Sequence, residues 1–434
     1  MMTFPQLIRH RGIEPLFRAI EISVAAQYSG HPFHIHAEGL RGTGKTSVIR
    51  AAQKVLPPIT RIRGCIYNCD PAKPHCPLHR HLSPGEVAAI GSETVPRPFL
   101  EISHSAKAGS VVGSIDLGKL TGQEAPVAAL LPGTIPQAHR GIIFIDEINR
   151  LADTCPELAD ILLDVMGTKP GRIQIEEPGL PTVEMPVSVS VWAASNPDED
   201  PGPLHHIRKQ LADRFDFLVP VSQPQDPQAV FAILKSRDVQ FTAQAAIAPL
   251  SPARLDSLPV PDDIRRTLAT IYVAFQLESL RAVETLETAA VLEALLSGSS
   301  TVSLDHLSRV LPFALGHRTS AEILAAIQKF LEDLKAGGRG ASSAAAASPG
   351  VLLTRRSGPG RFKAWLYSLL SRLPRRDRPP QRPSGAPEAE KRNASPAKMP
   401  SPRDSVITAP PKPATPLSEL ADEQLIATSP KAHD

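Results

Sequence analysis

A glycine-rich turn ending in Lys-Thr, within the stretch EGLRGTGKTS (Glu38 to Ser47), restricts the fold of this chain more than any other segment. Its pattern, Gly-x-x-x-x-Gly-Lys-Thr, is typical of loops that wrap a phosphate. Lys45 would neutralise the β- and γ-phosphates, and the Thr46 hydroxyl would bind Mg²⁺. The backbone N–H groups expected to meet phosphate oxygens are those of Gly39, Gly42, Thr43 and Gly44. An ordinary turn is the alternative, but a strand-like run, PFHIHAEG, precedes the pattern and a helix-like run, TSVIRAAQKVL, follows it. We therefore predict a nucleotide-binding loop.

A pair of acidic residues ends another strongly apolar run, about 100 residues further along the chain. This run, GIIFIDE, is apolar up to Asp146 and Glu147. Asp146 can hold Mg²⁺, often through water, and Glu147 can polarise the water that attacks a phosphate. Two acids at a strand end are by themselves more often a solvated terminus. The phosphate loop upstream favours the catalytic interpretation.

Asn196 and Arg214 supply two further polar groups of the kind that phosphoryl transfer needs. The apolar run VSVSVWAAS ends just before Asn196, whose amide could orient the lytic water. Arg214 ends the helix-like part of LADRFDF, from which a guanidinium could reach the γ-phosphate of a neighbouring subunit. Phosphoryl transfer requires positioning and charge neutralisation more than covalent chemistry. Taken alone, Arg214 would be a surface salt-bridge residue.

The distribution of apolar residues predicts an α/β fold. The strand-like runs are nearly all apolar, as is typical of strands buried on both faces of a parallel sheet. From about Asp226 the pattern becomes helical, in stretches such as IRRTLATIYVAFQLESL. We expect a nucleotide-binding α/β domain over residues 1–225, with a cysteine-rich insertion over 64–81, and a helical domain over 226–336.

A change of composition marks the end of the chain. Pro, Ser, Ala, Lys and Arg dominate residues 337–434, which cannot bury enough apolar surface to offset the entropy of ordering. We predict a disordered tail there, interrupted by an amphipathic helix over 361–373, RFKAWLYSLLSRL. This basic helix could dock on an anionic membrane surface or in the groove of a partner, or could fold back on its own domain.

Three of the four cysteines lie close together, in GCIYNCDPAKPHCPLHRH. Cys65, Cys69, Cys76 and His79 could close a tetrahedral zinc site, and the thiols could instead hold part of an iron–sulfur cluster. The spacing matches no standard zinc finger, so reduced thiols or a redox-sensitive pair are the alternative. Four cysteines in 434 residues are no disulfide framework, which favours the reducing cytoplasm.

Several stretches together resemble the AAA+ ATPases, and specifically the ATPase subunit I of magnesium chelatase and its close relatives. The resemblance spans roughly residues 30–222 in the family's order, and the helical part resembles the family's lid. The stretches that carry it are AEGLRGTGKTSVIRAAQKVLP, VVGSIDLGKLTG, PGTIPQAHRGIIFIDEINRLADTCPELADILLDVM, GRIQIEEPGLPTVEMP, VWAASNPDEDPGPLHHIRKQLADRFDFLVPV and ESLRAVETLETAAVLEALLSG.

This resemblance implies an AAA+ P-loop parallel sheet flanked by helices, an α-helical lid and a ring of six copies, with ATP and Mg²⁺ at each interface. Arg214 would complete the site of the neighbour, and Arg281 would contact the γ-phosphate in cis as a second sensor. GRIQIEEPGLPTVEMP and VVGSIDLGKL would lie in two hairpin insertions, which in the family couple the ring to a partner with a von Willebrand A-type domain.

The expected function is that of an ATP-hydrolysing ring motor that remodels or activates a partner, with metal insertion into a tetrapyrrole as one client reaction. A MoxR-like chaperone for another metalloenzyme is an alternative, because HSAKAGSVVG and the proline-rich tail depart from the family pattern. A nucleotide-regulated adaptor without useful turnover is a third. The net charge of only +3 argues against direct nucleic-acid binding.

Overall fold

The computed structural model describes residues 4, 7–115, 130–175, 182–235 and 258–344. All of them belong to one compact unit, Met1–Arg375. The predicted amphipathic helix over 361–373 lies outside the described residues, as does the predicted tail beyond 344. Within the described ranges, every helix is too short or too polar to cross a bilayer.

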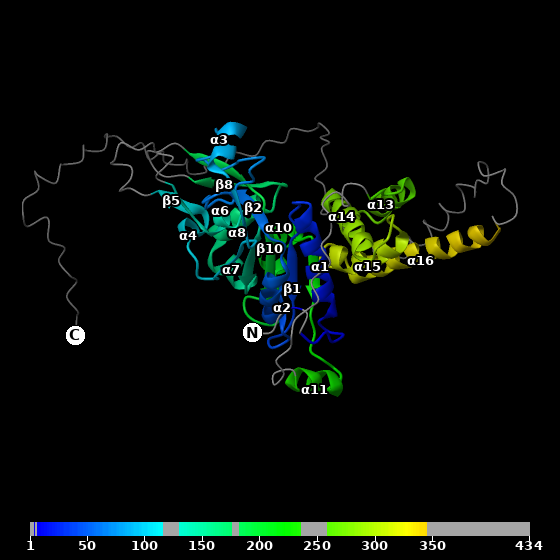
Figure 1. The fold of residues 1–434 in the computed structure, drawn as a ribbon. Coiled ribbons are helices and arrows are strands. Elements are labelled where there is room, and N and C mark those ends of the chain that lie inside the picture. Colours follow the sequence, from blue (N-terminus) through cyan, green and yellow to red (C-terminus); the bar gives the residue numbers. More distant parts are fainter. Residues whose placement is uncertain (1–3, 5–6, 116–129, 176–181, 236–257, 345–434) are drawn as a thin grey trace, which may run out of the picture. The chain divides into compact units, whose positions relative to one another are not determined.

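A five-stranded parallel sheet forms the centre of the fold, as the apolar runs predicted (Figure 1). Its strands lie in the order β11-β1-β10-β7-β4, so β1 lies between β11 and β10, the two strands of the sheet that come last along the chain. Their bounds are Ile35–Glu38 (β1), Phe99–Ile102 (β4), Ile142–Asp146 (β7), Ser190–Ser195 (β10) and Phe217–Pro220 (β11).

The central strands are buried on both faces, which explains their uninterrupted apolar sequence. Successive side chains of a strand point to opposite faces, and β7 shows this alternation. Ile142 and Phe144 pack in one hydrophobic cluster with α1 (Glu14–Tyr28), whereas Ile143 and Ile145 pack in a second cluster on the other face.

Among the described residues, three antiparallel pairs of strands lie in the connections between the strands of the sheet. The arms of the predicted GRIQIEEPGLPTVEMP hairpin are present as β8 and β9, and part of VVGSIDLGKL lies at the start of β5. The paired strands are β2 (Ile59–Ile62) with β3 (Ser92–Val95), β5 (Gly113–Ile115) with β6 (Leu130–Pro132), and β8 (Gly171–Ile175) with β9 (Val183–Val187).

Helices cover the sheet and form the C-terminal part of the described chain (Figure 1). Those between the strands are α2 (Lys45–Ala52) with the 3-10 turn η2 (Gln53–Val55), α3 (Pro84–Ile90), α4 (Ala108–Val112), α6 (Thr134–Gln137), α7 (Ile148–Thr154), α8 (Pro156–Val165), α9 (Leu204–Ile207) and α10 (Lys209–Arg214). Those that follow the sheet are α11 (Pro227–Lys235), α13 (Asp262–Ala274), α14 (Leu280–Leu296), α15 (Leu304–Leu315) and α16 (Ala321–Ala344).

The C-terminal helices differ from the predicted pattern at two points. The run IRRTLATIYVAFQLESL is helical only up to Ala274, because Gln276 adopts a left-handed backbone; α14 then begins at Leu280, where the hydroxyl of Ser279 caps it by accepting from the Arg281 N–H. In addition, α16 continues to Ala344, beyond the predicted start of the tail at residue 337. Residues 337–344, GGRGASSA, include three glycines, so helix propensity does not explain this extension.

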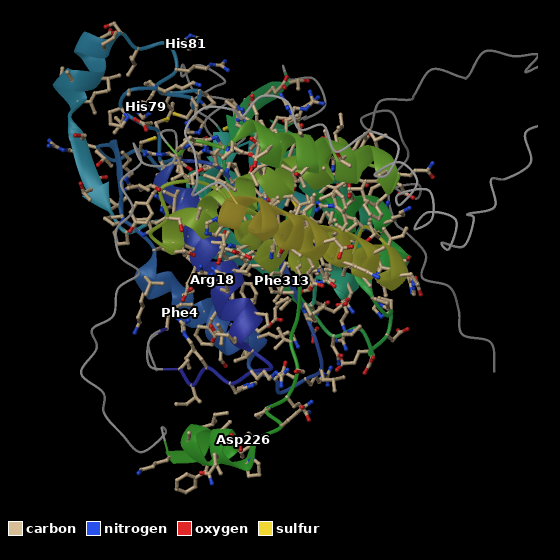
Figure 2. All side chains as sticks on the ribbon, turned by 90° about the vertical axis from the view of Figure 1, so that its right-hand side faces the viewer. Phe4, Arg18, His79, His81, Asp226 and Phe313 are labelled. Atoms are coloured by element: carbon tan, nitrogen blue, oxygen red, sulfur yellow. The ribbon has the colours of Figure 1, made fainter. Side chains whose placement is uncertain are left out.

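The helical part packs directly on the first helix of the chain. Arg18 of α1 (Figure 2) donates from Nε to Oε2 of Glu293 in α14 over 2.8 Å, and Glu293 is only 3% exposed. The helical part also contacts the end of α10, where Arg318 donates to the backbone oxygens of Asp213 and Phe215, both over 2.8 Å. A buried carboxylate is stable in its charged form only when it is paired. The ion pair between Arg18 and Glu293 therefore fixes α14 against α1.

Two buried histidines hold β1 to β10. Nδ1 of His34 accepts from the Val191 N–H over 3.0 Å, and Nε2 of His36 lies 2.8 Å from the Ser195 hydroxyl. Both rings are about 1% exposed. Burial lowers the pKa of His34 to about 4 and that of His36 to about 3, so both rings are neutral at pH 7.

We therefore predict that acid destabilises the fold through these rings. Since their folded pKa values lie below the unfolded value of 6.5, the unfolded chain takes up protons first as the pH falls. The free energy of unfolding should fall by up to ~1.4 kcal/mol per pH unit per ring below pH 6.5. Urea denaturation between pH 7 and 5 should show a shallower pH slope for His36→Gln, which keeps a partner for Ser195. The exposed control His31→Gln should keep the wild-type slope, and equal slopes for all three proteins would contradict this account.

Candidate functional site

The register of the sheet brings the ends of three strands to one edge. Glu38 at the end of β1 is paired with Ser195 at the end of β10, and Ala194 is paired with Asp146 at the end of β7. All three strands are parallel, so the chain segments that follow them leave from the same edge. These segments are the glycine-rich loop, the acidic residue Glu147 and the loop that begins at Asn196.

The glycine-rich loop has the backbone that its sequence predicts. Gly42 and Gly44 have φ values of 73° and 88°, a left-handed conformation that glycine adopts without strain. Helix α2 begins immediately afterwards at Lys45, so its free N–H groups and the positive end of its dipole face the loop. This arrangement is suited to binding an anion.

Lys45 is held inside the loop. Its Nζ donates to the carbonyl oxygens of Gly39 over 2.5 Å and Leu40 over 2.7 Å. The residue is only 8% exposed, and burial lowers the pKa of its ammonium group. The cation is thus fixed at the base of the loop by backbone dipoles.

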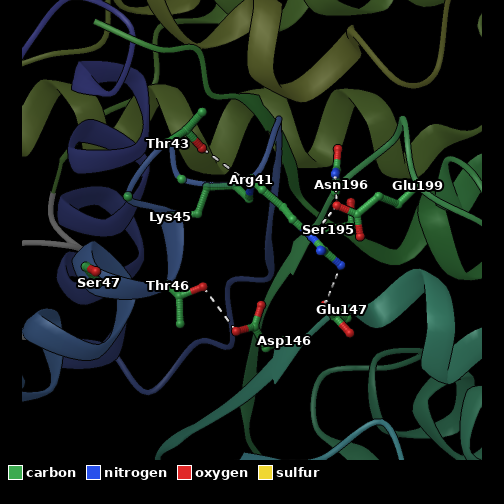
Figure 3. A pocket seen from close by; sticks show the side chains of 12 residues that line it. Arg41, Thr43, Lys45, Thr46, Ser47, Asp146, Glu147, Ser195, Asn196 and Glu199 are labelled. Carbon is green, nitrogen blue, oxygen red and sulfur yellow. Dashed lines mark hydrogen bonds and ion pairs between the residues drawn. The ribbon is translucent and has the colours of Figure 1, made fainter.

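A pocket of about 310 Å³ opens over the loop (Figure 3). Residues 41–47 of the loop line it, together with Asp146, Glu147, Ser195, Asn196 and Glu199. The Thr46 hydroxyl donates to Oδ2 of Asp146 over 3.1 Å. A hydroxyl and a carboxylate at this distance form a hard oxygen donor pair of the kind that Mg²⁺ prefers. The structure therefore brings the predicted metal-binding residues together.

Glu147 lies beside this pair at the start of α7. Its backbone is left-handed, with φ 56°, which is uncommon for a residue with a side chain and is frequent at functional sites. Its carboxylate forms ion pairs with Arg150 at 3.2 Å and with Arg41 at 4.0 Å. The acid is half-buried and faces the pocket.

The sequence reasoning missed two charged residues that line the pocket, Arg41 and Glu199, and their neighbour Arg150, which does not line it. Glu199 accepts from the side-chain amide of Asn196 and from Arg41, and Arg41 reaches it across the pocket mouth from the glycine-rich loop (Figure 3). Arg150 of α7 also pairs with Glu199, at 3.4 Å. Charged residues in loops are common on any protein surface, so the sequence contains no signal that would have singled these out.

The two predicted arginine residues lie outside the pocket lining. Arg214 donates from Nη1 to the carbonyl oxygen of Gly167 over 3.3 Å, and Arg281 donates from Nη2 to the same oxygen over 3.0 Å. Burial, followed by repulsion from Arg281, lowers the pKa of Arg214. The structure thus brings these two residues to each other, at the end of α8, rather than to the phosphate loop.

The four predicted metal ligands also come together, at a separate place in the fold. The ligand atoms of Cys65, Cys69, Cys76 and His79 all lie within 4.8 Å of one another. None of them lines the pocket described above.

A parallel sheet with a phosphate-binding loop after β1, an acidic end on β7 and a following helical domain defines the AAA class of P-loop ATPases. The match to sequence families agrees with this class. Residues 9–199 match the family model described as magnesium chelatase, subunit ChlI, and residues 265–333 match the AAA lid domain.

Individual relatives narrow the assignment. The magnesium-chelatase 38 kDa subunit of Acidiphilium rubrum is 35% identical over 298 residues, which cover 65% of this chain and 82% of the relative. The subunit of the same name from Cereibacter sphaeroides is 30% identical over 64% of this chain and 82% of its own. The chloroplastic magnesium-chelatase subunit ChlI-2 of Arabidopsis thaliana is 26% identical over 64% of this chain and 68% of its own. The chain belongs to the ChlI family of magnesium-chelatase AAA+ subunits.

Gly39, predicted to contact phosphate, has a packing role in this structure. A Cβ atom built there would lie 2.1 Å from the Val221 carbonyl oxygen, so only glycine fits between β1 and the end of β11. We expect Gly39→Ala to lower the free energy of unfolding by about 1–3 kcal/mol, measured by urea denaturation. The matched control is Gly109→Ala in α4, where the added Cβ meets nothing within 4 Å and helix propensity favours alanine. Equal stabilities of the two variants would refute the packing role.

Proposed function

We propose that this chain binds and hydrolyses Mg·ATP, and that it works as a ring-forming motor subunit of the magnesium-chelatase type. The observation that carries the proposal is the 3.1 Å contact between Thr46 of the phosphate loop and Asp146 of the acidic strand, at the floor of the pocket. Two segments separated by about 100 residues converge there on the donor set that a magnesium nucleotide requires.

The residues present suit that ligand. The glycine-rich loop offers backbone N–H groups to phosphate oxygens, with Gly42, Thr43 and Gly44 lining the pocket. Lys45 supplies a fixed positive charge, and Thr46 with Asp146 would hold Mg²⁺. When bound, Mg²⁺ neutralises charge on the β- and γ-phosphates.

Hydrolysis is assigned to the two side chains that face the pocket from β7 and β10. The carboxylate of Glu147 accepts a proton from the attacking water, which is the role of a general base. The amide of Asn196 orients that water, and Glu199 fixes the amide through its hydrogen bond. The ion pairs of Glu147 with Arg150 and Arg41 hold its carboxylate at the pocket.

Arg214 is proposed to complete the site of a neighbouring copy in a homo-oligomeric ring, with six copies by resemblance to the family. Its position supports a role in trans, because it does not line the pocket of its own chain. The same argument applies to Arg281, which shares the Gly167 carbonyl with Arg214 and lies outside that pocket. We therefore propose that both arginines serve the neighbour, in place of the cis role expected for Arg281.

The proposed work of the ring is to remodel or activate a partner. The curated relatives are named as subunits, which supports action within a larger assembly. By family resemblance the partner carries a von Willebrand A-type domain and the client reaction is metal insertion into a tetrapyrrole. A MoxR-like chaperone role for another metalloenzyme, with the same ATPase site, is the second candidate. Four free cysteines support a location in the reducing cytoplasm.

Glu147→Gln tests the hydrolytic step. We expect steady-state phosphate release to fall by about 10²-fold or more, because the amide cannot accept the proton from water. ATP binding, followed with a fluorescent analogue, should stay within a few-fold of wild type, since Lys45, Thr46 and Asp146 are intact. The surface variant Glu157→Gln in α8, outside the pocket, controls for the loss of one carboxylate. Unchanged turnover in Glu147→Gln would remove this residue from the proposed role.

Mixing two inactive variants tests whether Arg214 acts in trans. Arg214→Ala should lower turnover by about 10³-fold or more, and Lys45→Ala should abolish it. In a 1:1 mixture, an intact loop meets an intact arginine at about a quarter of the interfaces, so turnover should rise well above that of either variant alone. Arg281→Ala with Lys45→Ala should give the same complementation. No recovery in either mixture, with assembly verified by light scattering, would place the arginines in cis.

A further inference from the structure

The insertion between β2 and β3 contains a group of side chains that the ATPase site does not use. It is closed at its base by the antiparallel pairing of Ile59–Ile62 with Ser92–Val95. Cys65, Cys69, Cys76 and His79 lie within it, and the three cysteines are at most 2% exposed. Their sulfurs are free, with no disulfide between them.

The spacing of the ligand atoms fits one ion. All four lie within 4.8 Å of one another, and Nδ1 of His79 is 3.2 Å from Sγ of Cys76. In a tetrahedral zinc site with Zn–S of about 2.3 Å, two sulfurs are separated by about 3.8 Å. The side chains therefore need to move only slightly to reach coordination distances.

The same spacing argues against an iron–sulfur cluster. A cluster distributes its thiolate ligands over several irons, so their sulfurs lie further apart than the ligands of a single ion. A set of three thiolates and one imidazole around one point is instead a standard structural zinc donor set. Four protein ligands leave no open coordination position, and the low exposure of the cysteines is typical of a closed structural site.

Backbone turns hold the sulfurs in place. The N–H groups of His75 and Cys76 point at Sγ of Cys69, at 3.4 and 3.3 Å, an arrangement that stabilises a thiolate. The turn before Cys69 is made by Asn68, whose φ of 52° is left-handed and whose side-chain amide donates to the Gln137 carbonyl over 2.6 Å. The N–H groups of His75 and Cys76 are not ligands themselves, but their hydrogen bonds to Cys69 Sγ would tune the properties of a metal bound there.

The insertion is tied to the body of the protein by residues just before β7. Arg140 donates to the Thr60 carbonyl over 2.6 Å and pairs with Asp70 at 3.2 Å. The ring of His75 stacks on that of His139 with centroids 3.7 Å apart, while its Nδ1 lies 3.2 Å from Sγ of Cys69. His75 thus contacts one thiol, whereas a ring nitrogen of His79 lies within 4.8 Å of all three sulfurs, which makes His79 the fourth ligand. Figure 2 shows His79 and, further out, His81 on this insertion.

We propose that Cys65, Cys69, Cys76 and His79 bind one structural Zn²⁺ ion, which closes the insertion between β2 and β3 and fixes it to the segment that leads into β7. This site is independent of nucleotide and of the proposed ATPase function. Among the residues that the structure describes, this is the one such group of ligands.

Metal analysis of the full chain tests this proposal without any activity measurement. The protein should be purified with a tag that binds no metal, under reducing and anaerobic conditions, and analysed by plasma mass spectrometry. We expect about one Zn²⁺ per chain, released when a mercurial blocks the thiols. Exchange with Co²⁺ should give the visible absorption of tetrahedral cobalt and a near-ultraviolet thiolate charge-transfer band.

Two pairs of variants separate ligands from neighbours. Cys76→Ser and His79→Ala should each lower zinc content at least several-fold after dialysis against a mild chelator, whereas Cys155→Ser and His81→Ala should keep it. If Cys76→Ser fails to fold, cobalt exchange into the unmodified chain still decides the question. Substoichiometric zinc without a tetrahedral cobalt spectrum would overturn the proposal, as would iron with acid-labile sulfide, or equal zinc loss in His79→Ala and His81→Ala.

Discussion

Hydrogen bonds between the parallel strands β1, β10 and β7 determine which residues can meet a common ligand. In this register Glu38, Ser195 and Asp146 end their strands at one edge of the sheet, and the functional segments begin one residue later. A slip of one residue would turn the apolar side chains of β7 to the wrong faces and would move Asp146 away from Thr46. The hydrophobic clusters on the two faces therefore hold the site in place, although they contain none of its polar groups.

The sequence allowed the phosphate loop, the acidic strand end and the central strands to be predicted, because each has a local signal. The left-handed glycines, the helix beginning at Lys45 and the apolar strands follow from backbone and burial rules. The positions of Arg41, Glu199 and Arg281 could not be predicted, since they depend on how loops and the helical part pack. The end of α13 at Ala274 was placed too late, because the residues that follow it up to the Ser279 cap are mostly apolar or helix-favouring.

The thiol-rich insertion shows the same division between local and tertiary information. The sequence identified its cysteines and singled out His79, with His75 and His81 close by along the chain, and the fold shows how the three histidines differ. His79 lies with the sulfurs, His75 stacks on His139, and His81 is absent from the group. Asn68 and Arg140 attach this insertion to the segment that leads into β7, the strand that ends in Asp146.

The carbonyl oxygen of Gly167 accepts hydrogen bonds from a guanidinium of α10 and from one of α14. Like charges held this closely repel, and an anion that approaches them relieves the repulsion. The orientation of α14 and the anion affinity of this surface are consequently linked: whatever shifts one must shift the other by the same free energy. If the anion belongs to a nucleotide on an adjacent copy, assembly of the copies and binding of the nucleotide are coupled, so that each favours the other.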